Sequence, residues 1–467
     1  MGSRRSLLAC CAGAGFATLL DQAVVNYAVP SLGTGLDAPV SGVQWFLSVY
    51  SLTFGLGLVP GGRLGDALGR RPLFVLGLAV FMAGALASAA APGIWWAVAA
   101  RAGQGLGAGL ISAQVLGVIQ DHFTGLPRIR ALAAYSAAGA AAAVVGPLGA
   151  GLILAVAPQG AGWRLLLALN LPFTLATLLL TLRSVPRQPR TGRRVHLDLP
   201  AILLVGGLVL LVTTPVIDPG IEGPELWTIV ALCGLLAVGT GLWEYRYAAR
   251  GRTPLFVPAL MTSRGFVVGN MVALLWFGGL VSFSTALTIY LLQGVGWSPL
   301  AVAAVLIPSA LARIAASSVS SQIYARFGGH TLPLALTIQA AGLLLLAGAS
   351  TAWNGGAFVA AVVGLELVIG LASAVLEPPL RAITLGFAPP IHHGVAAAFL
   401  QLTQRLSATF CVALVTGTML ATDLRTVTAG GLRRGFLICF ALLAAASVLS
   451  FSRALIRTSP PLVAVSR

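Results

Sequence analysis

The sequence predicts an all-α polytopic membrane protein with about fourteen transmembrane helices. Hydrophobic residues make up 58% of the chain and charged residues only 9%, whereas about a quarter of the residues in a soluble domain are charged. Apolar runs of roughly 20 residues recur from end to end, and each is long enough to cross a bilayer as a helix. No polar stretch is long enough to form a soluble core of its own.

The apolar runs divide the chain into three parts. We predict an N-terminal six-helix bundle in residues 1–185, a linker with two additional transmembrane helices in 186–252, and a C-terminal six-helix bundle in 253–467. Two related bundles around a midplane site are the usual plan of a transporter. The expected spans lie near residues 8–31, 44–61, 73–91, 94–118, 131–156, 161–182, 198–216, 226–245, 265–293, 299–322, 331–350, 356–385, 394–421 and 435–456.

All 28 basic residues are arginines, and the formal net charge is +16. The arginines fall in short loops on alternate sides of the apolar runs, as the positive-inside rule expects. We therefore expect both termini in the cytoplasm and no binding to nucleic acid. Arg425, Arg433 and Arg434 break the rule, so either this outer loop tolerates charge or the last two spans are displaced. The five cysteines show no spacing that indicates a disulfide framework or a metal site.

A short charged stretch separates the second and third apolar runs. It reads Gly-Arg-Leu-Gly-Asp-Ala-Leu-Gly-Arg-Arg, from Gly62 to Arg71. Its glycines permit a tight turn and close helix contacts. We expect Asp66 to complement the N-terminus of a helix that begins near Pro72, and Arg70 to mark the cytoplasmic side together with Arg71. The residues alone also fit an ordinary solvated loop.

The second half of the chain carries a trace of the same stretch. Between its second and third predicted spans it reads Ala-Arg-Phe-Gly-Gly-His, from Ala325 to His330. Gly328 matches Gly69, but the acid is absent. An internal repeat is therefore indicated, and any gating role of this stretch is expected to be stronger in the first half.

An acid and an arginine lie within the first and fourth apolar runs. Asp21 belongs to Leu-Asp-Gln-Ala-Val-Val-Asn-Tyr-Ala-Val-Pro, and Arg101 opens Arg-Ala-Gly-Gln-Gly-Leu-Gly-Ala-Gly. Ionisable residues inside spans are costly and are functional candidates. Both residues lie roughly 12–15 Å from the outer end of their helices, so the side chains can meet. The pair is either a site of proton coupling or a purely structural ion pair.

The fifth apolar run contains Gly-Pro-Leu-Gly-Ala-Gly, in which Gly146, Pro147, Gly149 and Gly151 stand out. Small residues allow helices to pack closely in a membrane, and proline bends a helix. Alone, the stretch also fits a generic packing face.

In this order, the stretches resemble motifs of the major facilitator superfamily, and in particular of its 14-helix drug:proton antiporters. The similar patterns are L-D-x-T-x-V-N-x-A-x-P, G-x-L-x-D-R-x-G-R-R, R-x-x-Q-G-x-G and the antiporter motif G-P-x-x-G-G. Trp163-Arg164 with Asn170 is similar to W-R-x-x-F-x-x-N-x-P. The resemblance covers nearly the whole chain.

The sequence departs from these motifs at Ala23, Ala67 and Ala150, where the patterns have Thr, Arg and Gly. The missing arginine at position 67 removes one charge from the stretch that begins at Gly62. These departures also fit a sensor that kept the fold but lost transport.

The resemblance implies the major facilitator fold and the export of hydrophobic or amphipathic small molecules, such as drugs or antibiotics, in exchange for protons. Asp21 would alternate between protonated and ionised forms, because burial favours the neutral acid and Arg101 favours the carboxylate. The cytoplasmic gate implied by the resemblance comprises Gly62, Asp66, Gly69, Arg70 and Arg71.

The expected partners are a small-molecule substrate, protons and the lipid bilayer, with a monomer as the functional unit in a bacterial plasma membrane. No cofactor is expected, because the proton gradient supplies the energy. The sequence has no Gly-x-x-x-x-Gly-Lys-[Ser/Thr] loop for a nucleotide.

The second half has its own acids within apolar runs. Glu366 and Glu377 are eleven residues apart and share a helix face, and Glu377 can pair with Arg381 one turn later. Either acid binds a cationic substrate or a second proton, or Glu377, Arg381 and Arg405 form a neutral network. We favour the network for Glu377. Glu366 has no evident partner in the sequence and is a second candidate for proton coupling, beside Asp21.

Several polar and aromatic residues are candidates for lining a substrate cavity, since such sites are mostly apolar with few polar groups. Aromatic residues near span ends are also common interfacial anchors. His392 and His393 are expected in a solvated cytoplasmic loop, not at a metal. The cavity candidates are Asn26, Tyr27, Gln44, Trp45, Tyr50, Gln114 and Glu377, with Trp276, Phe277, Phe283 and Tyr290 from the second half.

One alternative is a transporter with a narrower substrate range, and another comes from a different class. An exporter dedicated to one endogenous metabolite or antibiotic would have the same motifs. A membrane enzyme is not expected, because we find no nucleophile elbow, no His-Glu-x-x-His and no cluster of acids or histidines at a membrane face.

Overall fold

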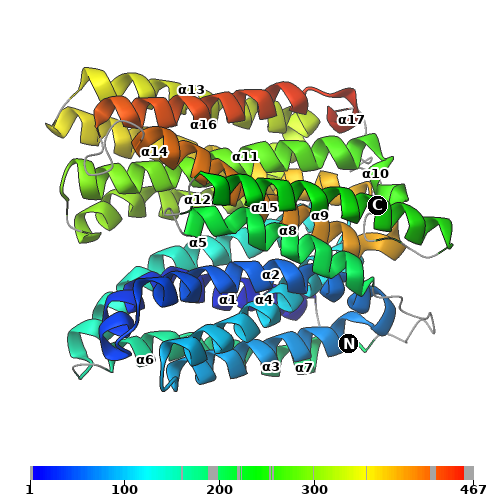
Figure 1. Ribbon diagram of the computed structural model, residues 1–467. Coiled ribbons are helices and arrows are strands. Elements are labelled where there is room, and N and C mark those ends of the chain that lie inside the picture. Colours follow the sequence, from blue (N-terminus) through cyan, green and yellow to red (C-terminus); the bar gives the residue numbers. More distant parts are fainter. Residues whose placement is uncertain are drawn as a thin grey trace. The chain divides into compact units, whose positions relative to one another are not determined.

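The computed structural model describes residues 4–158, 161–187, 198–217, 221, 223–251, 254, 257–297, 299–353, 355–420 and 428–456. These residues are mostly helical and contain no strand (Figure 1). The chain forms two compact units. Unit 1 comprises residues 1–122, 145–262 and 388–402, and unit 2 comprises residues 123–144, 263–387 and 403–467. Two long helices, α5 (Gly125–Val156) and α15 (His393–Leu420), contribute residues to both units.

The other helices follow the chain order within each unit. In unit 1 they are α1 (Arg4–Gly35), α2 (Val40–Leu68), α3 (Arg70–Ala89), α4 (Ile94–His122), α6 (Gly162–Ala168), α7 (Leu171–Ser184), α8 (Leu199–Ile217), α9 (Pro224–Ala249), α10 (Pro258–Met261) and the short η3 (Pro390–His392). In unit 2 they are α11 (Arg264–Ile289), η1 (Tyr290–Gly294), α12 (Pro299–Phe327), η2 (Gly328–His330), α13 (Thr331–Ala352), α14 (Gly355–Gly386), α16 (Ala429–Ser450) and α17 (Arg453–Ile456).

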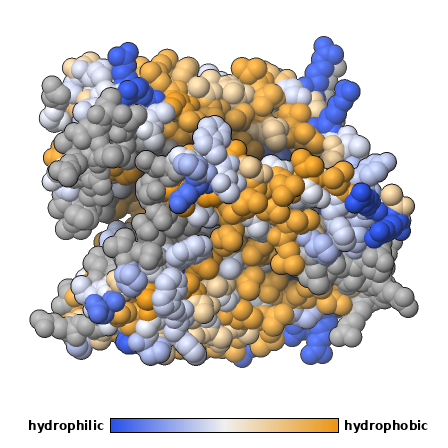
Figure 2. All heavy atoms as spheres, viewed as in Figure 1, coloured by the Kyte–Doolittle hydropathy of each residue, from blue (hydrophilic) through white to orange (hydrophobic). Residues whose placement is uncertain are grey.

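The predicted polytopic all-α fold is confirmed. Within the described residues, 11 segments are long and apolar enough to cross a membrane, and one of them, Ala304–Ala352, contains both α12 and α13. Thirteen of the described helices have at least 19 residues, and α6 and α7 together form a fourteenth segment, Gly162–Ser184. Hydrophobic side chains cover much of the face shown in Figure 2, as expected for a surface in contact with lipid.

Glycines allow α4 to pack directly against both α2 and α3 in unit 1. A methyl group at Gly105 would collide with the backbone of Tyr50 in α2, and one at Gly107 would lie 2.5 Å from the backbone nitrogen of Phe81 in α3. The glycines that resemble a family motif therefore have a direct packing function, since a small residue lets two helix backbones approach closely.

The charged stretch between the second and third spans is mostly helical, which corrects the prediction of a turn. Helix α2 continues through Pro60 to Leu68, and α3 begins at Arg70, so only Gly69 separates them. Gly69 has φ +93°, which a residue with a side chain rarely adopts. The predicted repeat has a counterpart here, because Gly328 has φ +55° directly after α12.

Two other spans also differ from the prediction. The sixth span is interrupted between α6 and α7 by Leu169 and Asn170. The last long helix, α16, begins at Ala429, six residues before the predicted start, so Arg433 and Arg434 lie in its first turns rather than in a loop. The last span was therefore misplaced; Arg425 lies outside the described residues.

The two linker helices, α8 and α9, pack on each other, and α8 also packs on α2. Arg63 of α2 is buried and donates a hydrogen bond to the carbonyl of Pro254, and its charge is stabilised by Asp198 and Glu244. Asp198 also accepts a hydrogen bond from Trp243 of α9 at 2.7 Å. The arginine that the sequence placed in a loop thus joins α2 to the linker helices.

Candidate functional site

Asp21 lies at the centre of a buried polar cluster in unit 1. Its Oδ2 pairs with Nη1 of Arg101 at 2.6 Å. Its Oδ1 accepts hydrogen bonds from Nε2 of Gln104 at 2.9 Å and from Nδ2 of Asn170 at 2.6 Å. We call these four residues the Asp21 cluster. The predicted meeting of Asp21 with Arg101 is confirmed, and each of the four side chains is at most 4% exposed.

The guanidinium of Arg101 has favourable neighbours besides the carboxylate. Its Nη1 also donates to Oε1 of Gln104 at 2.8 Å, and its carbon lies 4.3 Å from the ring centre of Tyr50 and 5.6 Å from that of Phe46. Aromatic rings at such distances stabilise a buried cation. Arg101 therefore retains stabilising contacts even when Asp21 is neutral.

The interruption between α6 and α7 positions Asn170 in this cluster. Asn170 is the residue directly before α7, and its backbone carbonyl accepts the hydrogen bond of the Thr174 backbone N–H at 2.9 Å. Pro172, in the first turn of α7, has no N–H to donate and suits a helix start. The sequence indicated a turn motif here, but not that its asparagine contacts Asp21.

The glycine- and proline-containing stretch of α5 lies beside the Asp21 segment of α1. A methyl group added to Gly146 would lie 2.7 Å from Cβ of Ala23, and one added to Gly149 would lie 3.4 Å from Leu169. Gly151 has nothing within 4 Å of such a group. The side chain of Pro147 is outside the described part. The glycines of this motif therefore differ in their packing. Gly146 makes the close contact between α5 and α1.

We expect Gly146→Val to weaken the α1–α5 contact and Gly151→Val to be tolerated. Valine at position 146 must displace α1 next to Asp21, and overpacking of this kind costs roughly 1–3 kcal/mol. Thermal unfolding of the two purified variants would compare these costs directly, with the melting temperature lowered only for Gly146→Val. Equal losses for both variants would contradict the assigned contact.

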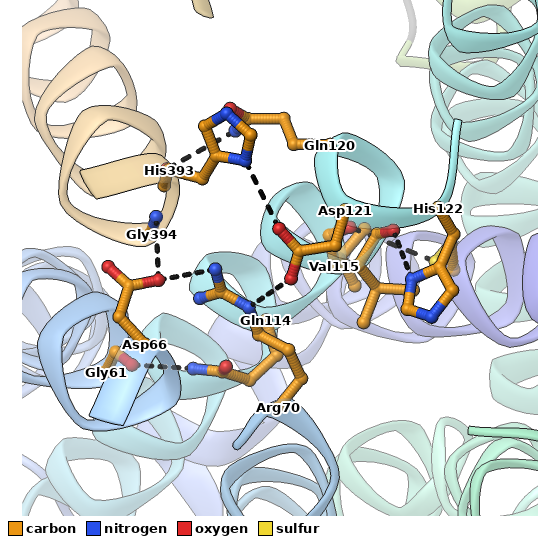
Figure 3. A network of polar contacts seen from close by, with 12 residues as sticks. Gly61, Asp66, Arg70, Gln114, Val115, Gln120, Asp121, His122, His393 and Gly394 are labelled. Carbon is orange, nitrogen blue, oxygen red and sulfur yellow. Dashed lines mark hydrogen bonds and ion pairs between the residues drawn. The ribbon is translucent and has the colours of Figure 1, made fainter. Parts of the chain in front are cut away.

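A second polar network joins the ends of α2 and α4 to the first turn of α15, all within unit 1 (Figure 3). Arg70 pairs with Asp66 and, through Nε at 3.0 Å, with Asp121. Nδ1 of His393 lies 3.2 Å from Asp121, and the backbone N–H of Gly394 donates to Asp66 at 3.1 Å. We call these five residues the Asp66 network.

Two interpretations of the sequence are wrong at this network. Asp66 lies in the last turn of α2 and complements the N-terminus of α15, not that of the helix that follows it in sequence. His393 is only 9% exposed and contacts Asp121, so it is not a solvated loop residue. Among the described residues, no group of three or more histidines, cysteines and acids is placed to hold a metal ion.

The other predicted gate residues lie around this network. Gly62 faces the backbone of Gly394, where a side chain would collide. Arg71 is half-buried and donates a hydrogen bond to the carbonyl of Leu182 in α7. Gln114, a cavity candidate, is fully buried and donates to the carbonyl of Gly61 at 2.7 Å, so it joins α4 to α2 beside the network.

Unit 2 contains a second buried acid with partners. Glu366 of α14 is 8% exposed and lies near Ser309 and in the field of Arg313, both on α12. The two helices meet closely here, since a methyl group at Gly370 would lie 3.1 Å from the carbonyl oxygen of Ser309. Glu366 therefore has neighbours on α12 that the sequence did not reveal.

The remaining site candidates lie in varied surroundings. Glu377 pairs with Arg381 at 2.7 Å, which confirms the predicted ion pair. Tyr27 and Trp45 are half-buried, and the side chains of Asn26 and Gln44 lie outside the described part.

Two aromatic candidates of the second half belong to the packed interior of unit 2. Trp276 donates to Gln339 at 3.0 Å, and the ring of Phe283 packs on that of Phe436 with centres 5.4 Å apart. Phe277 and Tyr290 are half-buried.

Comparisons with known proteins agree with this architecture. The family model described as "Major Facilitator Superfamily" matches residues 11–412. A probable actinorhodin transporter of Streptomyces coelicolor is 30% identical over 415 residues, which cover 86% of this chain and 70% of that protein. The puromycin resistance protein of Streptomyces alboniger is 32% identical, with 85% of this chain and 78% of that protein covered.

A solved structure shows the same fold. The proton:xylose symporter XylE superposes with a TM-score of 0.68 over 95% of this chain and 94% of that protein. Its sequence identity of 18% supports a shared fold only.

Proposed function

Since the chain belongs to the major facilitator superfamily and is a multi-pass membrane transporter, we propose that it exports hydrophobic or amphipathic small molecules, antibiotics among them, in exchange for protons. The names of the actinorhodin and puromycin relatives support this substrate class. Two six-helix bundles, joined by two linker helices, would operate by alternating access in a bacterial plasma membrane. Both termini would be cytoplasmic.

The observation that carries the proposal is the Asp21 cluster. A carboxylate with 4% exposure inside an apolar helix is retained at a cost, and such residues mark proton and substrate pathways. Asp21 binds the proton in this mechanism, with Glu366 as the second candidate. Protonation neutralises the acid, and Arg101 keeps its contacts with Gln104 and Tyr50. Both protonation states of Asp21 are thus supported by neighbouring groups.

The Asp66 network is the cytoplasmic gate in this proposal. Its contacts hold the first turn of α15 against the end of α2. In this mechanism, opening of the gate breaks the bonds that Gly394 makes to Asp66 and His393 makes to Asp121. The network would thus stabilise the outward-facing state, and substrate would enter from the cytoplasm once it opens.

Energy would come from the proton gradient without a cofactor, and the working unit would be a monomer. An exporter dedicated to one metabolite is the second candidate, because each of the two relatives is named for a single antibiotic. A sensor of the same fold, which binds ligand without moving it, is a third and weaker candidate.

The test uses purified protein in liposomes under an imposed pH gradient. A panel of lipophilic cationic dyes and antibiotics is followed with and without an ionophore that collapses the gradient. We expect movement of at least one compound that stops with the ionophore. Movement of one antibiotic but no dye would favour the dedicated exporter. Binding of a ligand with no gradient-driven movement of any compound would contradict transport.

A further inference from the structure

Asn170 has an unused hydrogen-bond acceptor beside the buried acid. Its Nδ2 donates to Oδ1 of Asp21 at 2.6 Å, while its own Oδ1 is buried and has no hydrogen-bond partner among the described residues. The side chain is 2% exposed. A buried amide oxygen without a partner is costly, so an occasional partner is expected.

The ionised and the protonated forms of Asp21 need different hydrogen-bond partners. The carboxylate only accepts hydrogen bonds, and Arg101, Gln104 and Asn170 all donate to it. A protonated Asp21 carries an O–H that needs an acceptor. Arg101 has no acceptor atom. Oε1 of Gln104 already accepts from Arg101 at 2.8 Å. The Oδ1 atom of Asn170 is the acceptor of the cluster that has no partner among the described residues.

The other groups near Asp21 do not change this conclusion. Among the described residues, Arg101 of α4 pairs with Asp21, and Tyr50 of α2 lies on the other side of the guanidinium. The α5 segment Val145–Val156 and the α7 segment Leu171–Leu182 contain no titratable residue. The one arginine of α6, Arg164, donates instead to the carbonyl of Ala89 at 2.7 Å.

We propose that Asn170 is a positioning residue that responds to the protonation state of Asp21 by rotating its amide, which rests on the proton-coupled function proposed above. With Asp21 ionised, Nδ2 donates to the carboxylate. Proton uptake forms an O–H bond on Oδ1 of Asp21, and the amide turns by about half a rotation so that its oxygen accepts from that O–H. Amide nitrogen and oxygen are nearly equal in shape, so the rotation requires no repacking. Proton release breaks the same O–H bond and reverses the rotation.

The position of Asn170 connects this rotation to the backbone. Asn170 directly precedes α7, and its carbonyl accepts from the Thr174 N–H in the first turn of that helix. Discontinuous helices are typical of the substrate and ion sites of transporters. The Asn170 side chain therefore rotates at the break between α6 and α7, where the sixth span has fewer helix hydrogen bonds.

Infrared difference spectroscopy of the full chain in liposomes tests the inference. The spectrum at low minus high pH gives the C=O band of the protonated acid, and loss of the band in Asp21→Asn assigns it. In Asn170→Leu the acid loses its acceptor, so we expect the band to move to higher wavenumber. The control variant Asp37→Asn changes an exposed acid outside the cluster and should leave the band of the protonated Asp21 unchanged.

Asn170→Ser and Asn170→Ala form a second pair, in case leucine prevents folding. The serine hydroxyl both donates and accepts, so its band should lie closer to the wild-type position than that of alanine. An Asp21 band that does not move in Asn170→Leu or Asn170→Ala overturns the inference and leaves proton coupling intact. The absence of any Asp21 band in the wild type between low and high pH overturns both the inference and Asp21 as the proton carrier.

Discussion

A chain carrying Asp21→Asn is expected to lose all transport that a pH gradient drives. Asparagine has the shape of aspartate but cannot bind and release a proton at any accessible pH. The substitution also removes the charge that pairs with Arg101 at 2.6 Å. Breaking a buried ion pair costs about 3–5 kcal/mol. Gln104 and the ring of Tyr50 retain their contacts with Arg101, so we expect the variant to fold with a lowered melting temperature.

The measurement is gradient-driven movement of an accepted substrate in liposomes, compared with exchange of the same substrate at equal pH on both sides. Asp21→Asn should abolish the first and retain part of the second, because it removes coupling and not the pathway. Asp37→Asn is the matched control: Asp37 is exposed and has φ +45°, which asparagine also adopts readily. Full gradient-driven transport by Asp21→Asn would make the Asp21 cluster structural and leave Glu366 as the coupling candidate.

The features that the sequence predicts well depend on position along a helix. Apolar runs reveal spans because each must satisfy its backbone hydrogen bonds within the bilayer. The depths of Asp21 and Arg101 follow from counting residues, so their contact could be expected. Gly328 could be matched with Gly69 for a different reason. A chain reversal between helices needs a residue that tolerates positive φ.

The features that the sequence does not predict depend on rotation about helix axes and on contacts between distant segments. Asp66 and Gly394 are 328 residues apart, and Asp121 and His393 are 272 apart. No local pattern shows that the N-terminus of α15 faces the end of α2. The partner of Glu366 was missed for a similar reason, because Arg313 lies on another helix whose orientation is set by packing at Gly370.

Arg70→Gln is expected to have the second-largest effect, through loss of the Asp66 network. Arg70 is 3% exposed and pairs with both Asp66 and Asp121. Removing one partner of a buried ion pair costs about 3–5 kcal/mol, which corresponds to a change of about a hundredfold or more in a conformational equilibrium. We therefore expect slow transport and faster hydrogen exchange in the first turn of α15, measured by mass spectrometry on the full chain. Arg71→Gln is the control, since Arg71 makes one bond to a backbone carbonyl, and should change both readouts little.

A double variant separates lost charge pairing from general damage to α3. If the loss in Arg70→Gln comes from two acids left close together without their arginine, then Asp121→Asn in the same chain removes one unpaired charge. The double variant should then recover part of the hydrogen-exchange protection, as expected for residues that interact directly. Asp121→Asn alone should weaken the network, because it removes a partner of both Arg70 and His393. Losses that simply add in the double variant would show that Arg70 and Asp121 act independently, and would contradict a gate held by this network.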